Sequence, residues 1–225
     1  MSIICAIRGS YGALRAMSGL TKVINPFCRR FDREKNCALR ASTALPPGPI
    51  NGQGLGKLAA LPYGAWDMGH NGCEVIAVYN ALIALGRPVP LPEIAASMER
   101  SDLLFNGFGG TNLSAVAAYL RARGVDVTVL RRRERARFDA ALRASDCAIL
   151  AYWTGRTLRR PGGGWNMLHT VSVLRTYGGV EVSNVFIDRR EPFTAQSISD
   201  FLHRTDGDPV CLFALKAVDK TEHTG

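Results

Sequence analysis

The chain has 225 residues, 47% of them hydrophobic, so it can bury an ordinary core and is not a disordered protein. Its apolar runs are far shorter than the about 20 residues that cross a bilayer, so we expect no membrane span. The net charge is +9, but residues 1–40 hold eight of the 28 Lys and Arg residues against two acidic residues, and the remainder is close to balanced. This distribution gives a nucleic-acid partner little support.

The six cysteines form no CxxC pair and no CxxH spacing, which argues against a zinc site and against a thioredoxin-like motif. We therefore expect no metal and no cofactor. Cys147 and Cys211 lie in apolar runs and are expected to be small buried side chains. Thiols of this kind suit a reducing compartment, so we expect a cytoplasmic protein.

Residues 1–56 differ in composition from the rest. They are rich in arginine, and residues 41–56 have the Pro and Gly content of a linker. Arg8 ends a short apolar patch that no positive region precedes, which argues against a secretory signal, although the composition would also suit an organelle transit peptide. We predict a loosely ordered basic extension and linker over residues 1–56, one domain over residues 57–218 and a tail over residues 219–225.

A buried helix that begins with a cysteine is the first strong feature of the domain. Residues 75–85 are apolar on almost every helical face, Asn71-Gly72 interrupts any structure before them, and Gly86 ends the helix. Cys73 falls in the first turn, where backbone N–H groups lack helical partners and the helix dipole favours negative charge. Both effects favour a thiolate at Cys73.

The remaining elements follow in chain order. Helices are predicted at residues 91–99, 111–120, about 135–144 and 197–202, and strands at 125–130, 147–153, 167–174, 180–186 and 210–215. Gly178-Gly179 predicts a hairpin, and the apolar run 147–153 predicts a central strand. Helices come first and an antiparallel sheet follows, which indicates an α+β fold.

Two other motifs allow more than one interpretation. Phe105–Gly110 is a glycine-rich loop without the lysine and the preceding strand of a phosphate-binding loop, so we interpret it as a turn or a substrate-facing loop. Arg131–Arg135 is a dense basic cluster, which is typical of a solvated surface but would also suit a phosphate site.

A cysteine nucleophile needs a base within hydrogen-bond reach and a third group that orients the base. His169 lies at the start of a predicted strand, and the hairpin at Gly178-Gly179 brings Asn184 back toward it. The amide of Asn184 can then accept the imidazole N–H and leave the other ring nitrogen facing Cys73. The order of Cys73, His169 and Asn184 therefore predicts a catalytic triad.

Four stretches resemble a known family: Asn71-Gly72-Cys73 opening an apolar helix, the strand Leu168–Val173, the Gly-Gly turn, and Val182-Ser183-Asn184. They are similar to the peptidase domains that cut double-glycine leaders from bacteriocin precursors, a branch of the papain-like cysteine peptidase superfamily. The resemblance covers about residues 60–215. It implies a papain-like fold with the cysteine helix packed on a C-terminal antiparallel sheet, Cys73 as nucleophile, His169 as base and Asn184 as the orienting residue.

The chain departs from that family at two positions. Glu74 stands where the family has glycine, and no glutamine lies several residues upstream of the cysteine to donate a hydrogen bond to the oxyanion. An ionised Asp67 cannot donate a hydrogen bond, whereas Asn71 can. We therefore assign the oxyanion site to Asn71 and the backbone N–H of Cys73.

Other residues near the predicted triad have alternative interpretations. Gly72, Trp66 and Trp165 are candidates to contact the substrate, although the two tryptophans would equally suit core lids. His70 is a rival base beside the cysteine, and Asp188 is a reserve for the orienting residue.

These residues predict a hydrolase that cleaves a peptide or amide bond through a thioester on Cys73, with a peptide or protein as its substrate. An acyl or glutaminyl transferase would use the same groups. In the alternatives Cys73 is a structural thiol in a catalytically inactive module that binds a peptide or protein, or the chain is a basic adaptor that binds nucleic acid.

Overall fold

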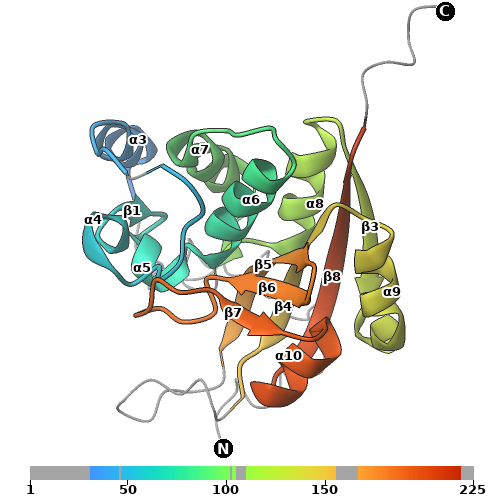
Figure 1. Ribbon diagram of the computed structural model, residues 1–225. Helices are drawn as coiled ribbons and strands as arrows, with labels where there is room; N and C mark the ends of the chain where they lie inside the picture. Colours follow the sequence, from blue (N-terminus) through green and yellow to red (C-terminus); the bar gives the residue numbers. More distant parts are fainter. Residues whose placement is uncertain (1–30, 46, 102, 105–109, 156–166, 219–225) are drawn as a thin grey trace, which may run out of the picture.

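The computed structural model describes residues 31–45, 47–101, 103–104, 110–155 and 167–218 (Figure 1). The candidate substrate residue Trp165, most of the predicted glycine loop, residues 1–30 and the predicted tail lie outside this range.

The domain contains an antiparallel sheet of six strands in the order β3-β8-β4-β5-β6-β7. The strands are β3 (Val125–Arg131), β4 (Cys147–Trp153), β5 (Leu168–Thr176), β6 (Gly179–Ser183), β7 (Phe193–Ala195) and β8 (Asp208–Ala217). A separate two-stranded sheet pairs β1 (Pro62–Tyr63) with β2 (Trp66–Asp67). The α+β class is confirmed.

The helices lie between and before these strands. They are α3 (Arg33–Ala41), α4 (Gly56–Ala59), α5 (Met68–Asn71), α6 (Cys73–Ala84), α7 (Leu91–Ser101), α8 (Leu113–Arg121), the 3₁₀ helix η3 (Arg132–Arg137), α9 (Phe138–Arg143) and α10 (Ile198–Arg204). The predicted helix at about residues 135–144 is thus a 3₁₀ turn followed by a short α-helix.

Helices cover both faces of the large sheet (Figure 1). Ile149 and Ala151 of β4 face the core that α6, α7 and α8 share, whereas Leu150 and Tyr152 face the core shared with α9 and α10. β4 lies between β8 and β5 and is buried on both faces. A strand buried on both faces has apolar residues at consecutive positions, as the sequence of β4 does. The prediction of a central strand here is confirmed.

The second strand of the predicted hairpin is shorter than expected. β6 pairs with β5 from Thr176–Gly179 to Ser172–Ser183 and then ends. The residue after it, Asn184, has a φ of 65° and turns the chain out of the sheet. The first residues of β5 consequently project beyond the end of β6, which leaves room for the start of α6.

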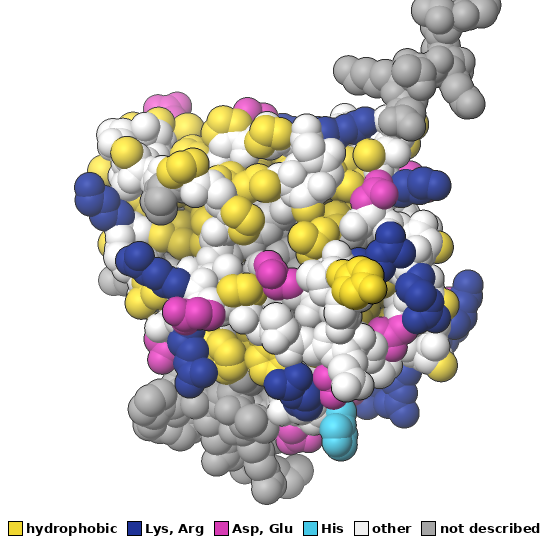
Figure 2. All heavy atoms as spheres, viewed as in Figure 1, with side chains coloured by type: hydrophobic (Ala, Val, Ile, Leu, Met, Phe, Trp, Pro, Cys, Tyr) yellow, Lys and Arg dark blue, Asp and Glu magenta, His cyan; other side chains and the backbone are white. Residues whose placement is uncertain are grey.

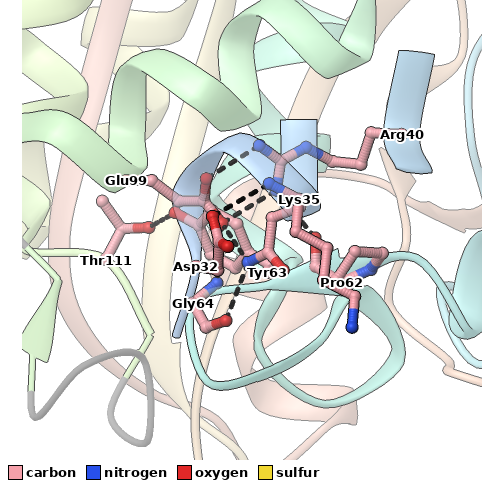
Figure 3. Close-up of polar contacts among 9 residues, drawn as sticks. Asp32, Lys35, Arg40, Pro62, Tyr63, Gly64, Glu99 and Thr111 are labelled. Carbon is pink, nitrogen blue, oxygen red and sulfur yellow. Dashed lines mark hydrogen bonds and ion pairs between the residues drawn. The ribbon is translucent and has the colours of Figure 1, made fainter. Parts of the chain in front are cut away.

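Residues 31–56 are folded against the domain in their described part, which corrects the prediction of a loose extension there. Asp32 caps α3 by accepting a hydrogen bond from Lys35 N at 3.0 Å. Arg40 of α3 is 0% exposed and donates to the two carboxylate oxygens of Glu99 on α7 at 2.8 and 2.7 Å (Figure 3). Buried charges require such a partner, so the arginine-rich composition of α3 does not indicate a loose extension.

Two kinds of feature are at issue among the described residues, a membrane-spanning helix and a cluster of metal-binding side chains. No helix among them is long and apolar enough to cross a bilayer, and no cluster of three His, Cys, Asp or Glu side chains is placed to hold a metal ion. Figure 2 shows Lys and Arg side chains interspersed with Asp and Glu over the face drawn.

Candidate active site

Cys73 is the first residue of α6, and the chain reaches it through a tight passage at Gly72. Gly72 is the N-cap of α6, and a Cβ added to it would lie 2.6 Å from the backbone oxygen of Met68 and 2.7 Å from its sulfur. Any larger residue would therefore force α5 and α6 apart. Gly72 therefore fixes the position of Cys73. This structural role does not depend on a contact between Gly72 and a substrate.

The sulfur of Cys73 lies against the edge of β5. The residue is 6% exposed, and a hydrogen bond from the Thr170 backbone contacts the thiol. This contact is made beyond the end of β6, which pairs with β5 only from Ser172 onward. The start of α6 thus occupies the place that a longer β6 would have filled, and it brings Cys73 beside the residue that follows His169.

The pKa of the Cys73 thiol is raised well above its usual value, in contrast to the expected thiolate. Burial is the largest cause, followed by the negative charge of Glu74 and by the hydrogen bond that Sγ donates to Glu74 Oε2 at 3.2 Å. The hydrogen bond from the Thr170 backbone acts in the opposite direction and is weaker. Because burial and Glu74 outweigh the helix N-terminus, the thiol is protonated at neutral pH.

His169 lies at the start of β5 on the same face as Val171 and Val173, as predicted. Its ring meets the edge of Tyr152, with centroids 6.0 Å apart, and its Nε2 lies 2.6 Å from the backbone oxygen of Asn184. A carbonyl oxygen only accepts hydrogen bonds, so Nε2 carries the proton. In neutral His169 the acceptor nitrogen is therefore Nδ1.

Asn184 contacts His169 through its backbone, which corrects the predicted role of its side-chain amide. Asn184 has a φ of 65°. The amide instead accepts from the backbone N–H of Gln53 at 3.1 Å and donates to Gln53 Oε1 at 2.9 Å. The Asn184 backbone N–H donates to Asn51 Oδ1 at 2.7 Å. Asn184 therefore positions His169 indirectly, by holding its own backbone in place.

Gln53 is a buried polar residue of this site that the sequence did not indicate. It is 3% exposed, and besides its two bonds with Asn184 its Nε2 donates to the Gly69 backbone oxygen at 3.1 Å. Its loop fits closely, since a Cβ at Gly52 would lie 2.6 Å from the Arg189 backbone oxygen. The Gly-rich composition that suggested a linker is instead needed for this close approach.

Asn71, the predicted oxyanion donor, lies at the end of α5, two residues before the cysteine. It is 4% exposed, and its Nδ2 is buried without a hydrogen-bond partner among the described residues. Buried amide donors are normally paired. An unpaired donor next to a candidate nucleophile is the arrangement that binding of a substrate oxygen would satisfy.

The other predicted residues are also located. Trp66 is 37% exposed and stacks on His70 with ring centroids 5.0 Å apart. Asp67 caps α5 by accepting from His70 N at 2.8 Å, and Asp188 is exposed. His70 and Trp66 therefore form a stacked pair beside the start of α6.

Cys73 lies against the edge of the sheet at Thr170, the residue that follows His169 in β5. Cys73 Sγ donates to Glu74, whereas His169 Nε2 donates to the Asn184 backbone. In comparisons with protein-family models, with curated proteins and with solved structures, this chain matched none.

Proposed function

We propose that this chain is a papain-like cysteine hydrolase that cleaves a peptide or amide bond through a thioester on Cys73. The observation that carries the proposal is the position of Cys73 at the start of a buried helix, in contact with the backbone of Thr170, the residue that follows His169 in the chain. This relation between a cysteine helix and a histidine strand is the one that the family resemblance implies.

Three of the functions that amide cleavage requires are assigned to residues of this site under the proposal. Cys73 is the nucleophile, and the neutral imidazole of His169 presents an acceptor nitrogen because Nε2 is bound to the Asn184 backbone. Asn71 Nδ2 and the Cys73 backbone N–H are the donors for the oxyanion that forms when the sulfur attacks. The products are an acid and an amine, or a transferred acyl group where an amine replaces water.

The proposal is tested by thiol labelling together with amide turnover. Wild-type protein and the variants Cys73→Ala, Cys147→Ala and His169→Ala are treated with iodoacetamide, and each cysteine is followed by peptide mass spectrometry. The same proteins are assayed for hydrolysis of a p-nitroanilide of a peptide ending in Gly-Gly, the leader that the resemblance suggests.

Cys73→Ala should abolish turnover, and His169→Ala should lower it by about 10²- to 10⁴-fold. Cys147→Ala is the matched control, because Cys147 is a buried thiol in β4 whose pKa is raised to about 12 by burial. Turnover that survives in Cys73→Ala would refute the proposal.

A second candidate is a catalytically inactive papain-like module that binds a peptide or protein. The observation that favours it is the pKa of Cys73, which burial and Glu74 raise well above its usual value. In that case Cys73 would react with iodoacetamide no faster than glutathione does at any pH from about 6 to 9. Substitution of Cys73 or His169 would then leave the pH dependence of the affinity for a bound peptide unchanged.

A further inference from the structure

Glu74 is a buried carboxyl group in direct contact with the candidate nucleophile. It is 1% exposed, and its Oε2 accepts the hydrogen bond of Cys73 Sγ at 3.2 Å. The backbone N–H groups of Thr111 and of Glu74 itself also donate to the carboxyl group. Because a thiol has a single proton, this contact means that the proton of Cys73 already points at Glu74.

The loop before α8 fits closely over this carboxyl group. Gly110 has a φ of +74°, and a Cβ added to it would lie 3.0 and 3.1 Å from the two carboxyl oxygens of Glu74. A side chain at Gly110 would therefore push the carboxyl group off the sulfur. The close approach also keeps water from Glu74, so its charge is weakly solvated.

The same domain contains a second buried glutamate, Glu99, whose contacts are those of a carboxylate with a structural role. Glu99 is 3% exposed and is paired with Arg40 at 2.7 Å, and its Oε1 accepts from Gly64 N at 2.8 Å (Figure 3). The same oxygen also accepts from Asn36 Nδ2 at 3.0 Å. Glu74, by contrast, forms no ion pair with any described residue and has a thiol in place of the cation. The ion pair and the hydrogen bonds explain the burial of the Glu99 carboxylate, whereas no cation among the described residues explains the burial of Glu74.

We propose that Glu74 is a second acid–base residue of this site, which takes the proton of the Cys73 thiol as the sulfur attacks the amide carbon. The inference rests on the proposed function, because it requires Cys73 to be the nucleophile. It places a proton acceptor on the same helix turn as the thiol, at the position where the sequence departs from the family pattern.

The reaction balances with Cys73, Glu74, His169 and one water molecule. The S–H bond breaks and its proton moves to Glu74 Oε2, while the S–C bond forms and the carbonyl π electrons move to the oxygen. The oxyanion then collapses, the C–N bond breaks, and the leaving amine takes the proton from Glu74. In the second half His169 Nδ1 takes a proton from the attacking water and returns it to the sulfur as the C–S bond breaks.

The titration of Glu74 supports this role. Burial raises its pKa from 4.5 to about 7, and the thiol hydrogen bond partly opposes this rise. Among the described residues, the titratable groups that face it are Cys73 on α6 and Tyr63 on β1, whose hydroxyl is bonded to Thr111. The negative charge of Glu99 also raises the pKa of Tyr63. An acid with a pKa near neutrality both accepts and returns a proton readily.

The test compares the pH dependence of Cys73 alkylation by iodoacetamide in wild-type protein, Glu74→Gln and the control Glu93→Gln. Glu93 forms a surface ion pair with Arg123 and lies outside the site. Wild-type protein and Glu93→Gln should show a first rise in rate with a midpoint near pH 7, the pKa of Glu74, and a second rise at high pH. Glu74→Gln should lose the first rise and lose amide turnover by about 100-fold.

The outcomes separate this inference from the proposed function. If Cys73→Ala keeps amide turnover, the proposed function fails and the inference fails with it. If Cys73 is reactive but Glu74→Gln keeps the first rise or the full turnover, only the inference is overturned.

A measurement that needs no Glu74 variant tests the contact itself. The protonated carboxyl band of Glu74 in the infrared spectrum should titrate near pH 7 in wild-type protein. In Cys73→Ala its midpoint should rise, because the thiol hydrogen bond that lowers the pKa of Glu74 is gone. An unchanged midpoint would overturn the inference.

Discussion

His169 Nε2 lies 2.6 Å from the backbone oxygen of Asn184, and the Asn184 amide is bound to Gln53 instead. The orienting group for the imidazole is thus a main-chain carbonyl. A substitution at position 184 should therefore act through the backbone conformation more than through the lost amide.

We expect Asn184→Gly to preserve the tautomer of His169, because glycine adopts the φ of 65° without strain and keeps the carbonyl. Asn184→Ala should instead destabilise the protein by about 1–3 kcal/mol, since alanine is strained at this φ. Nitrogen-15 NMR of the imidazole reports the tautomer, and urea unfolding reports the stability. If the amide were the acceptor, both variants would lose the Nε2–H form equally.

Gln53→Ala should lower the free energy of unfolding by about 1–3 kcal/mol, because it leaves Asn184 Nδ2 and the Gly69 carbonyl without partners in a buried place. Urea unfolding measures this loss. Gln196→Ala is the control, because Gln196 is exposed. A Gln53 variant as stable as the control would mean that the loop carrying Gln53 contributes nothing to the fold.

Asn71→Ala should leave stability almost unchanged but lower amide turnover by about 10²- to 10³-fold. The physical reason is that Asn71 Nδ2 has no partner among the described residues, so its removal breaks no hydrogen bond of the resting protein. The loss should appear in kcat rather than in KM, because the oxyanion exists only in the transition state. A fall in stability without a fall in kcat would assign Asn71 a structural role.

Glu74→Gln should change the pH dependence of stability. The pKa of Glu74 is raised from 4.5 to about 7 in the folded protein, so folding favours its protonated form. This contribution to the free energy of unfolding is fully present below about pH 4.5 and is lost as the pH rises to about 7, for a total on the order of 3 kcal/mol. Glu74→Gln should lack this slope in urea unfolding between pH 5 and 7, whereas Glu93→Gln should retain it.

Arg40→Met should destabilise the protein by about 3–5 kcal/mol, because it leaves the buried Glu99 carboxylate without its cation. Arg123→Met, which breaks a surface pair with Glu93, should cost less than about 1 kcal/mol. Thermal unfolding of the two variants provides the comparison. Equal losses would show that α3 is not anchored through Arg40.

The sequence by itself determined the elements whose signals are local. The apolar run after Cys73, the predicted helix at residues 111–120 and the Gly178-Gly179 turn each correspond to an element that the structure contains, because helix patterning and turn chemistry depend on neighbouring residues. The α+β class follows from the order of these elements.

Only the tertiary structure decided the surroundings of the thiol. Contacts between distant segments bring Gln53 to Asn184, replace the Asn184 amide by its backbone oxygen, and bury Glu74 against Cys73. The helix N-terminus alone favoured a thiolate at Cys73. Burial and the Glu74 charge oppose it more strongly, and neither the burial nor the distance between the two groups is encoded in the local pattern.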